Sequence, residues 1–173
     1  MSNVRLIGLT TIKIGDITST KAMGSGASLT TIAGIVPDSA HLIIETPGTT
    51  DLFIEESDLP DIQLLGTSKK TLEFATRDLG FDLLIEAFSG ASASSTWSAP
   101  VTAMVLREKC LQAVSKVYNN KLLVLNIARA SVRTGGDLRF SKTESGQVSF
   151  SCDVLIPASS TVISPITIKQ QAS

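Results

Sequence analysis

Two β-prone runs flank a short turn in the second half of the chain. Leu111–Tyr118 and Lys121–Ile127 are rich in Leu and Val, and Asn119 and Asn120 lie between them. A two-residue hairpin loop of type I′ needs positive φ at both central residues, which Asn accepts more readily than most residues. The pattern therefore predicts an antiparallel β-hairpin with its turn at Asn119 and Asn120.

A longer strand is predicted where polar and apolar residues alternate from Gln147 to Leu155. Before it, the two glycines in Thr134–Asp137 predict a break, Leu138–Lys142 a strand and Thr143–Gly146 a turn. Alternation places every second side chain on one face of a strand. The expected core face of the last strand consists of Val148, Phe150, Cys152 and Val154.

The first half contains shorter strand patterns, bounded by glycines, prolines and small polar residues. We expect strands at Val4–Leu9, Ile12–Ile17, Leu29–Val36, Leu42–Glu45 and Leu72–Ala75.

One segment has helical periodicity, and we expect a helix over residues 78–89. Asp78 can cap the free amides of the first turn, and Gly90 can end the helix. The following residues, Gly90–Thr96, are small and predict a linker loop. Such a short helix must pack on a sheet to be stable. The central stripe of its apolar face would be Leu79, Leu83 and Ala87.

These patterns predict a single mainly-β domain over residues 1–173. The expected architecture is an antiparallel β-sandwich or partly closed barrel with one short flanking helix. We expect the small-residue loop 18–28 and the C-terminal segment 158–173 to be contact arms. The first has two glycines, and Pro157 and Pro165 keep the second extended.

Composition describes a folded protein with a weakly charged exterior. Hydrophobic residues make up 43% and charged residues 18% of the chain, whereas typical domains carry about 25% charged residues. Such a surface suits coverage by other subunits, and it also suits an extracellular β-protein. Without an export signal or an apolar run long enough to cross a bilayer, we expect synthesis in a cytosol. Cys110 and Cys152 are then expected as buried free thiols.

Charge is segregated along the chain, although the total is −1. Residues 1–21 carry +2, residues 69–100 carry −1 and residues 101–173 carry +5. Residues 22–68 carry −7 and no Lys or Arg. Their acids are Asp38, Glu45, Asp51, Glu55, Glu56, Asp58 and Asp61.

The residues that carry catalysis are scarce, so we expect no catalytic site, cofactor site or metal site. His41 is the only histidine, and its spacing from Ser39 and Cys110 suggests no catalytic pairing. The cysteines lack zinc-site spacing, and Gly15–Lys21 lacks the spacing of a phosphate loop. The acidic residues do not form an EF-hand loop. With 5% aromatic residues and a sequence pI of about 5.8, specific nucleic-acid binding is not expected either.

Several of these elements together resemble the phage tail tube proteins. The matching features are the helical segment Phe81–Gly90, Trp97–Pro100, the hairpin around Asn119, and Leu138–Glu144 before the strand Val148–Leu155. The resemblance covers roughly residues 69–157, about half of the chain. It implies a virion structural protein without enzymatic activity. Subunits would join edge to edge into hexameric rings, and rings would stack into a tube through which DNA passes during ejection.

The resemblance also implies where the protein works and with what. It would be made in the host cytoplasm and reside in the tail of the virion, away from membranes. Its partners would be further copies of itself, other tail proteins and, transiently and non-specifically, DNA. A channel lining should be acidic, because Lys and Arg near phosphates hold DNA by releasing counterions. The candidate lumen residues are Glu45, Glu55, Glu56, Asp58 and Asp61.

Charge segregation suggests a contact between the acidic segment of one copy and the basic C-terminal block of the next. The candidate interface residues are Arg129, Arg133 and Arg139. In an alternative interpretation, the two blocks meet within one monomer. Three other functions remain open: a different ring-forming phage protein such as a tail terminator or head–tail connector, a secreted β-domain that binds protein or carbohydrate, and an enzyme of unrecognised type.

Overall fold

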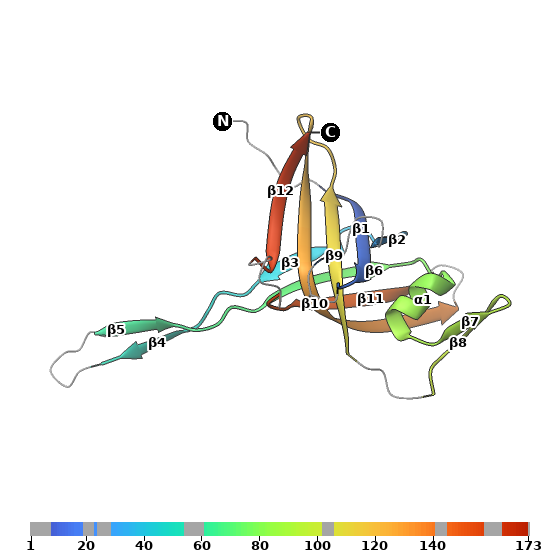
Figure 1. Cartoon of the computed structure of the whole chain (residues 1–173), viewed down its shortest axis with the longest axis horizontal. Helices are drawn as coiled ribbons and strands as arrows, with labels where there is room; N and C mark the ends of the chain where they lie inside the picture. Colours follow the sequence, from blue (N-terminus) through green and yellow to red (C-terminus); the bar gives the residue numbers. More distant parts are fainter. Residues whose placement is uncertain are drawn as a thin grey trace.

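Figure 1 shows the computed structural model of the chain. It describes residues 8–18, 23, 29–53, 61–101, 106–140, 145–157 and 164–172, with only the backbone for 138–140. Antiparallel strands dominate the described residues, which contain one short helix and no closed barrel. The predicted mainly-β fold is confirmed. The described part contains no helix long and apolar enough to cross a membrane.

One eight-stranded sheet forms the body, in the order β2-β1-β9-β10-β11-β6-β3, and β12 pairs with β10 beside it. Two short hairpins, β4–β5 and β7–β8, are separate two-stranded sheets. The strands are β1 (Leu9–Asp16), β2 (Leu29–Ile32), β3 (His41–Ile44), β4 (Thr49–Leu52), β5 (Ile62–Leu65), β6 (Lys70–Thr76), β7 (Ala91–Ala93), β8 (Thr96–Ser98), β9 (Arg107–Ser115), β10 (Lys121–Phe140), β11 (Ser145–Val154) and β12 (Ile166–Ala172), and the helix is α1 (Phe81–Phe88).

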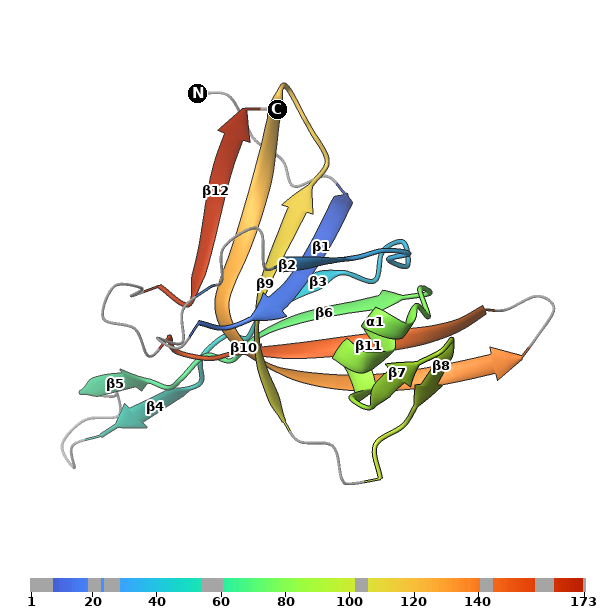
Figure 2. The ribbon, with the colours of Figure 1, turned by 45° about the vertical axis from the view of Figure 1, so that its right-hand side comes forward.

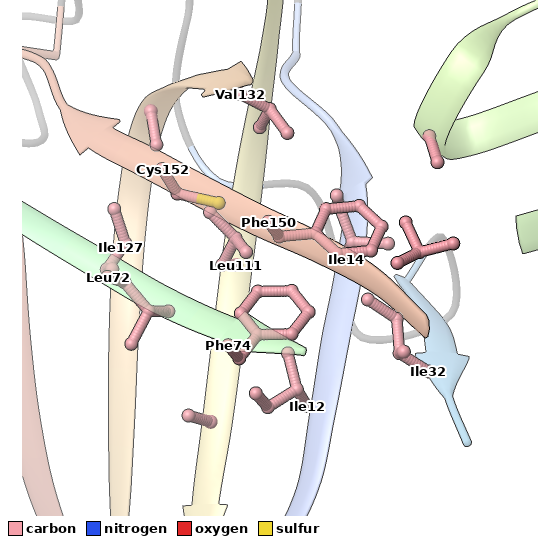
Figure 3. Packing of buried hydrophobic residues seen from close by; sticks show 14 of the residues in the cluster. Ile12, Ile14, Ile32, Leu72, Phe74, Leu111, Ile127, Val132, Phe150 and Cys152 are labelled. Carbon is pink, nitrogen blue, oxygen red and sulfur yellow. The ribbon is translucent and has the colours of Figure 1, made fainter. Parts of the chain in front are cut away.

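The long strand β10 bends the sheet into two parts that enclose the core. Its first part pairs with β9 and β12, and the part from Ala130 onward pairs with β11. In both Figure 1 and Figure 2, β1 and β9 run across the direction of β6 and β11. The core lies between these layers, as Figure 3 shows. Phe74 and Phe150 stack there with ring centroids 4.7 Å apart.

The predicted hairpin is confirmed between β9 and β10. Asn119 and Asn120 have φ of 51° and 56°, as a type I′ turn requires. The amide of Tyr118 donates to the carbonyl of Lys121 at 2.8 Å, and the amide of Lys121 donates back at 3.1 Å. Two reciprocal hydrogen bonds therefore close this turn.

The predicted core face of β11 is also confirmed. Val148, Phe150 and Cys152 are buried, and Val154 packs partly buried against the same cluster. Both cysteines are buried free thiols, as expected.

The predicted break at Thr134–Asp137 is wrong, because β10 continues through it. Gly135 pairs with Ser149 and Gly136 with Val148 on β11. Gly136 lies under the helix: a Cβ on it would be 2.7 Å from Cζ of Phe88. The glycine therefore serves a close approach inside a strand.

The helix is confirmed but begins at Phe81, three residues later than predicted. Gly80 has φ −57° and ψ 146°, so the chain is still extended there. Asp78 accepts a hydrogen bond from the amide of Gly80, at 3.0 Å, and none from the first helical turn. Leu79 consequently lies outside the helix and is exposed. The buried helical side chains are Leu83, Leu84 and Ala87.

The predicted linker at Gly90–Thr96 contains a hairpin instead. Ser94 and Ser95 take positive φ, 45° and 65°, at its turn. The strands β7 and β8 follow α1, and Trp97 donates its indole N–H to the carbonyl of Ser89 at 2.9 Å. The hairpin is thus tied to the end of the helix.

The described residues test the predictions for the N-terminal and C-terminal segments only in part. Leu9–Asp16 forms one strand where two were predicted, and residues 1–7 lie outside the description. Of loop 18–28, only Thr18 and Met23 are described, so its role as an arm stays a prediction. Within the C-terminal segment, β12 pairs with β10 of its own chain.

Candidate assembly surfaces

A two-stranded hairpin projects from one side of the body. We call its described residues, Thr49–Phe53 and Asp61–Leu65, the hairpin arm. It prolongs β3 and β6, because the amide of Glu45 donates to Lys69 at 2.9 Å and that of Gly66 donates to Gly48 at 2.7 Å. In Figures 1 and 2 the arm extends clear of the body.

The arm is exposed and carries several large apolar side chains. Every residue of β4 and β5 is exposed, although an isolated two-stranded hairpin is at best marginally stable in water. Exposed apolar clusters mark interaction sites, because burying them against another surface is favourable. The exposed large apolar side chains are Leu52 (46%), Phe53 (60%), Ile62 (50%), Leu64 (51%) and Leu65 (72%).

A carboxylate on β11 anchors the base of the arm. Asp153 pairs with Lys69 at 3.1 Å and with Arg133 at 2.7 Å, and it accepts a hydrogen bond from Thr71 at 2.9 Å. Burial raises the pKa of Asp153, but the hydrogen bonds from Lys69 and Thr71 and the two positive charges outweigh it. The pKa therefore lies below its ordinary value.

The structure describes only two of the five predicted lumen acids. Glu45 lies at the base of the arm and Asp61 on the arm, and both are exposed. Glu55, Glu56 and Asp58 lie outside the described residues. Neither Glu45 nor Asp61 forms an ion pair with a described residue. The expectation that these acids face a channel stays a prediction.

The predicted interface arginines have partners inside their own subunit. Arg129 donates to both carboxylate oxygens of Glu108, through Nε at 2.9 Å and through Nη2, and Nη1 donates to the carbonyl of Ile156 at 3.1 Å. Arg133 pairs with Asp153. The side chain of Arg139 lies outside the description. Neither Arg129 nor Arg133 forms an ion pair with a described acid of segment 22–68. Their contact with a neighbouring copy stays a prediction.

A second charged surface lies at the turn between β9 and β10. We call Lys116–Lys121 together with Lys169 of β12 the lysine tip. The register pairs Lys121 with Ala172 and Val124 with Lys169, which brings β12 beside the turn. Lys116 and Lys169 are exposed and Lys121 is half-buried. None of these three lysines forms an ion pair with a described residue.

A polar cleft opens on the outer side of β6, β10 and β11. It has a volume of about 410 Å³. Glu73 and Arg133 contribute charges, and hydroxyls come from Ser39, Ser149 and Ser151. No group of three or more potential metal ligands occurs anywhere in the described residues.

No known family model matches the chain, and no curated protein is similar enough to count as a relative.

The apolar residues of the arm were missed by the sequence analysis, which found only the acids there. Two short apolar clusters, Leu52–Ile54 and Ile62–Leu65, flank the acids in the sequence. Paired apolar clusters around a polar centre could have indicated a hairpin. Nothing in the sequence indicated that the hairpin would leave the body.

Proposed function

We propose that this chain is a virion structural protein that polymerises through its hairpin arm, in the manner of the phage tail tube proteins it resembles. One observation carries the self-association: five large apolar side chains of the arm are between 46% and 72% exposed. The resemblance over residues 69–157 supplies the rest of the proposal. Copies form hexameric rings, the rings stack, and DNA passes through the channel during ejection.

The arm supports a contact between unlike surfaces. In this proposal the arm of one subunit meets a different surface on the next subunit, and the contact is not reciprocated, which makes it heterologous. Heterologous contacts generate closed rings or open filaments. Both outcomes are compatible with a tube built from stacked rings.

The acidic character of the arm supports passage of DNA. Asp51 and Asp61 are its described charges, and it has no Lys or Arg. Phosphates near such a surface release no counterions and are not held. In this proposal some of Glu45, Glu55, Glu56, Asp58 and Asp61 line the channel.

The test is assembly of the purified protein at rising concentration, followed by sedimentation velocity and negative-stain microscopy. The wild type is expected to form rings or tubes. The variant Leu64→Ser/Leu65→Ser should remain monomeric with an unchanged Tm, because both leucines are exposed in the subunit. Val101→Ser/Leu106→Ser is the matched control, since these residues are also large, apolar and exposed but lie outside the arm. A wild type that stays monomeric at all concentrations contradicts the proposal and favours a binding module.

A further inference from the structure

We propose that the hairpin arm of one copy binds the lysine tip of a second copy. This inference rests on the proposed function only in that the arm joins copies. It adds the surface that receives the arm, which consists of the lysine tip and the adjoining side chain of Ile168 on β12.

Charge complementarity points to this pairing. Asp51 and Asp61 are the described charges of the arm, and Lys116, Lys121 and Lys169 are those of the tip. The sequence has no acid between Lys109 and Gly136 and none after Asp153, so no side chain in these stretches neutralises the tip. Neither surface forms an ion pair within the described residues of its own chain.

The tip also offers apolar surface to the arm. Val117 is 54% exposed and Ile168, on the neighbouring β12, is 63% exposed. Exposed ion pairs contribute little free energy, so adhesion must come mainly from apolar and backbone contacts. Charge then sets the orientation and the rate of association. A surface that combines lysines with exposed aliphatic side chains meets both needs of the arm.

The arrangement of the two surfaces directs the contact to another molecule. In both Figure 1 and Figure 2 the arm and the β9–β10 turn leave the body in different directions. A copy with this arrangement does not lay its arm on its own tip. The reciprocal hydrogen bonds between Tyr118 and Lys121 hold the turn in one conformation, so binding costs little ordering of the tip.

Other basic or hollow surfaces fit the arm less well. Arg129 and Arg133 already pair with Glu108 and Asp153. The cleft lined by Arg133 also contains Glu73, which would repel the acids of the arm. Asp61, a candidate lumen residue, faces the neighbouring tip in this inference.

A charge exchange between two variants tests the pairing. The arm variant is Asp51→Lys/Asp61→Lys, and the tip variant is Lys116→Glu/Lys121→Glu. Each variant alone presents like charges at the contact and should assemble at least about tenfold less well than the wild type at low salt. An equimolar mixture should recover assembly, because the basic arm meets the acidic tip and the acidic arm meets the basic tip. Arg77→Glu, which reverses the charge of an exposed arginine outside both the arm and the tip, should assemble normally.

The outcomes separate this inference from the proposed function. If the Leu64/Leu65 variant fails to assemble while the tip variant assembles normally, the arm joins copies but binds elsewhere. A mixture that stays monomeric, with both variants folded, also overturns the inference. A tip variant that assembles but loses retention of double-stranded DNA would assign the lysines to nucleic acid instead. If the wild type itself stays monomeric, the proposed function fails.

Discussion

Gly136 allows α1 to lie against β10. A Cβ at this position would be 2.7 Å from Phe88 Cζ, whereas a Cβ at the adjacent Gly135 would meet nothing within 4 Å. Gly136→Ala should therefore lower the free energy of unfolding by about 1–2 kcal/mol relative to Gly135→Ala, because the packed ring must move. Urea denaturation of the two variants measures this difference. Equal urea midpoints for the two variants would mean that the Phe88 ring moves aside without a loss of stability.

Asp153 makes the stability of the base of the arm depend on pH. Its pKa is lower in the folded protein than the ordinary value of 3.8. The stabilisation is therefore present above about pH 4 and is lost as the pH falls through the lowered pKa. Asp153→Asn should be less stable than the wild type at pH 7, and the difference should shrink toward pH 2. Thermal unfolding across this range is the measurement, and a constant difference would exclude linkage to Asp153.

At the scale of elements, the sequence predicted the turn and the strand whose signals lie within a short stretch of residues. The Asn119–Asn120 turn needs only positive φ at two residues, and β11 needs only every second residue to be apolar. Both patterns are complete within about ten residues. They could be recognised without knowledge of the remaining fold.

Elements whose cause lies elsewhere in the fold could not be predicted. The two glycines of β10 indicated a break, but the reason for Gly136 is its close approach to Phe88, almost fifty residues earlier in the sequence. The β7–β8 hairpin depends on two serines with positive φ and on Trp97 bonded to Ser89. The charge pattern found the acids of the candidate site, but charge alone could not show that the apolar residues beside them project from the body.

The end of α1 is held by a cation from another element. The helix has no basic residue in its last turn. Arg107 on β9 donates Nη1 to the carbonyls of Ile85 and Glu86, at 2.9 and 3.3 Å, and Nη2 to the hydroxyl of Ser89. A cation at a helix C-terminus satisfies free carbonyls and interacts favourably with the helix dipole.

Arg107→Ala should therefore loosen α1 together with the β7–β8 hairpin, at a cost of about 1–3 kcal/mol. Trp97 is the only tryptophan of the chain and bonds to Ser89, so its fluorescence reports on this region. The fluorescence emission of Trp97 should shift to the red, and the midpoint of urea denaturation should fall. Arg77→Ala, at an exposed arginine, is the control. An unchanged spectrum in both variants would show that α1 holds its position without Arg107.

At the scale of the whole molecule, the segregated charges divide into two groups. Arg129, Arg133 and Lys69 pair with acids inside the subunit. The lysines of the tip and the acids of the arm form no ion pair among the described residues. The net charge of a segment therefore does not identify an interface; the charges without a partner in their own subunit are the better indicator.

The C-terminal strand β12 bears on both the stability of the monomer and its assembly. The sequence predicts a contact arm over residues 158–173. In the structure, β12 pairs with Lys121–Ile127 of β10, and Ile166 packs against the core. Deletion of Ile166–Ser173 removes a strand from the sheet and exposes the edge of β10.

We therefore expect this deletion to lower the free energy of unfolding of the monomer itself, by about 2–4 kcal/mol. Several ladder hydrogen bonds, each worth about 0.5–1.5 kcal/mol net, are lost with the packing of Ile166, and the entropy regained by the missing residues offsets part of the loss. Urea denaturation at a concentration below assembly measures it. Ile168→Ser is the control, because its side chain is 63% exposed and its strand stays paired. If the deletion leaves the monomer as stable as the wild type but abolishes polymer, β12 acts in assembly alone and its pairing with β10 contributes little to the fold.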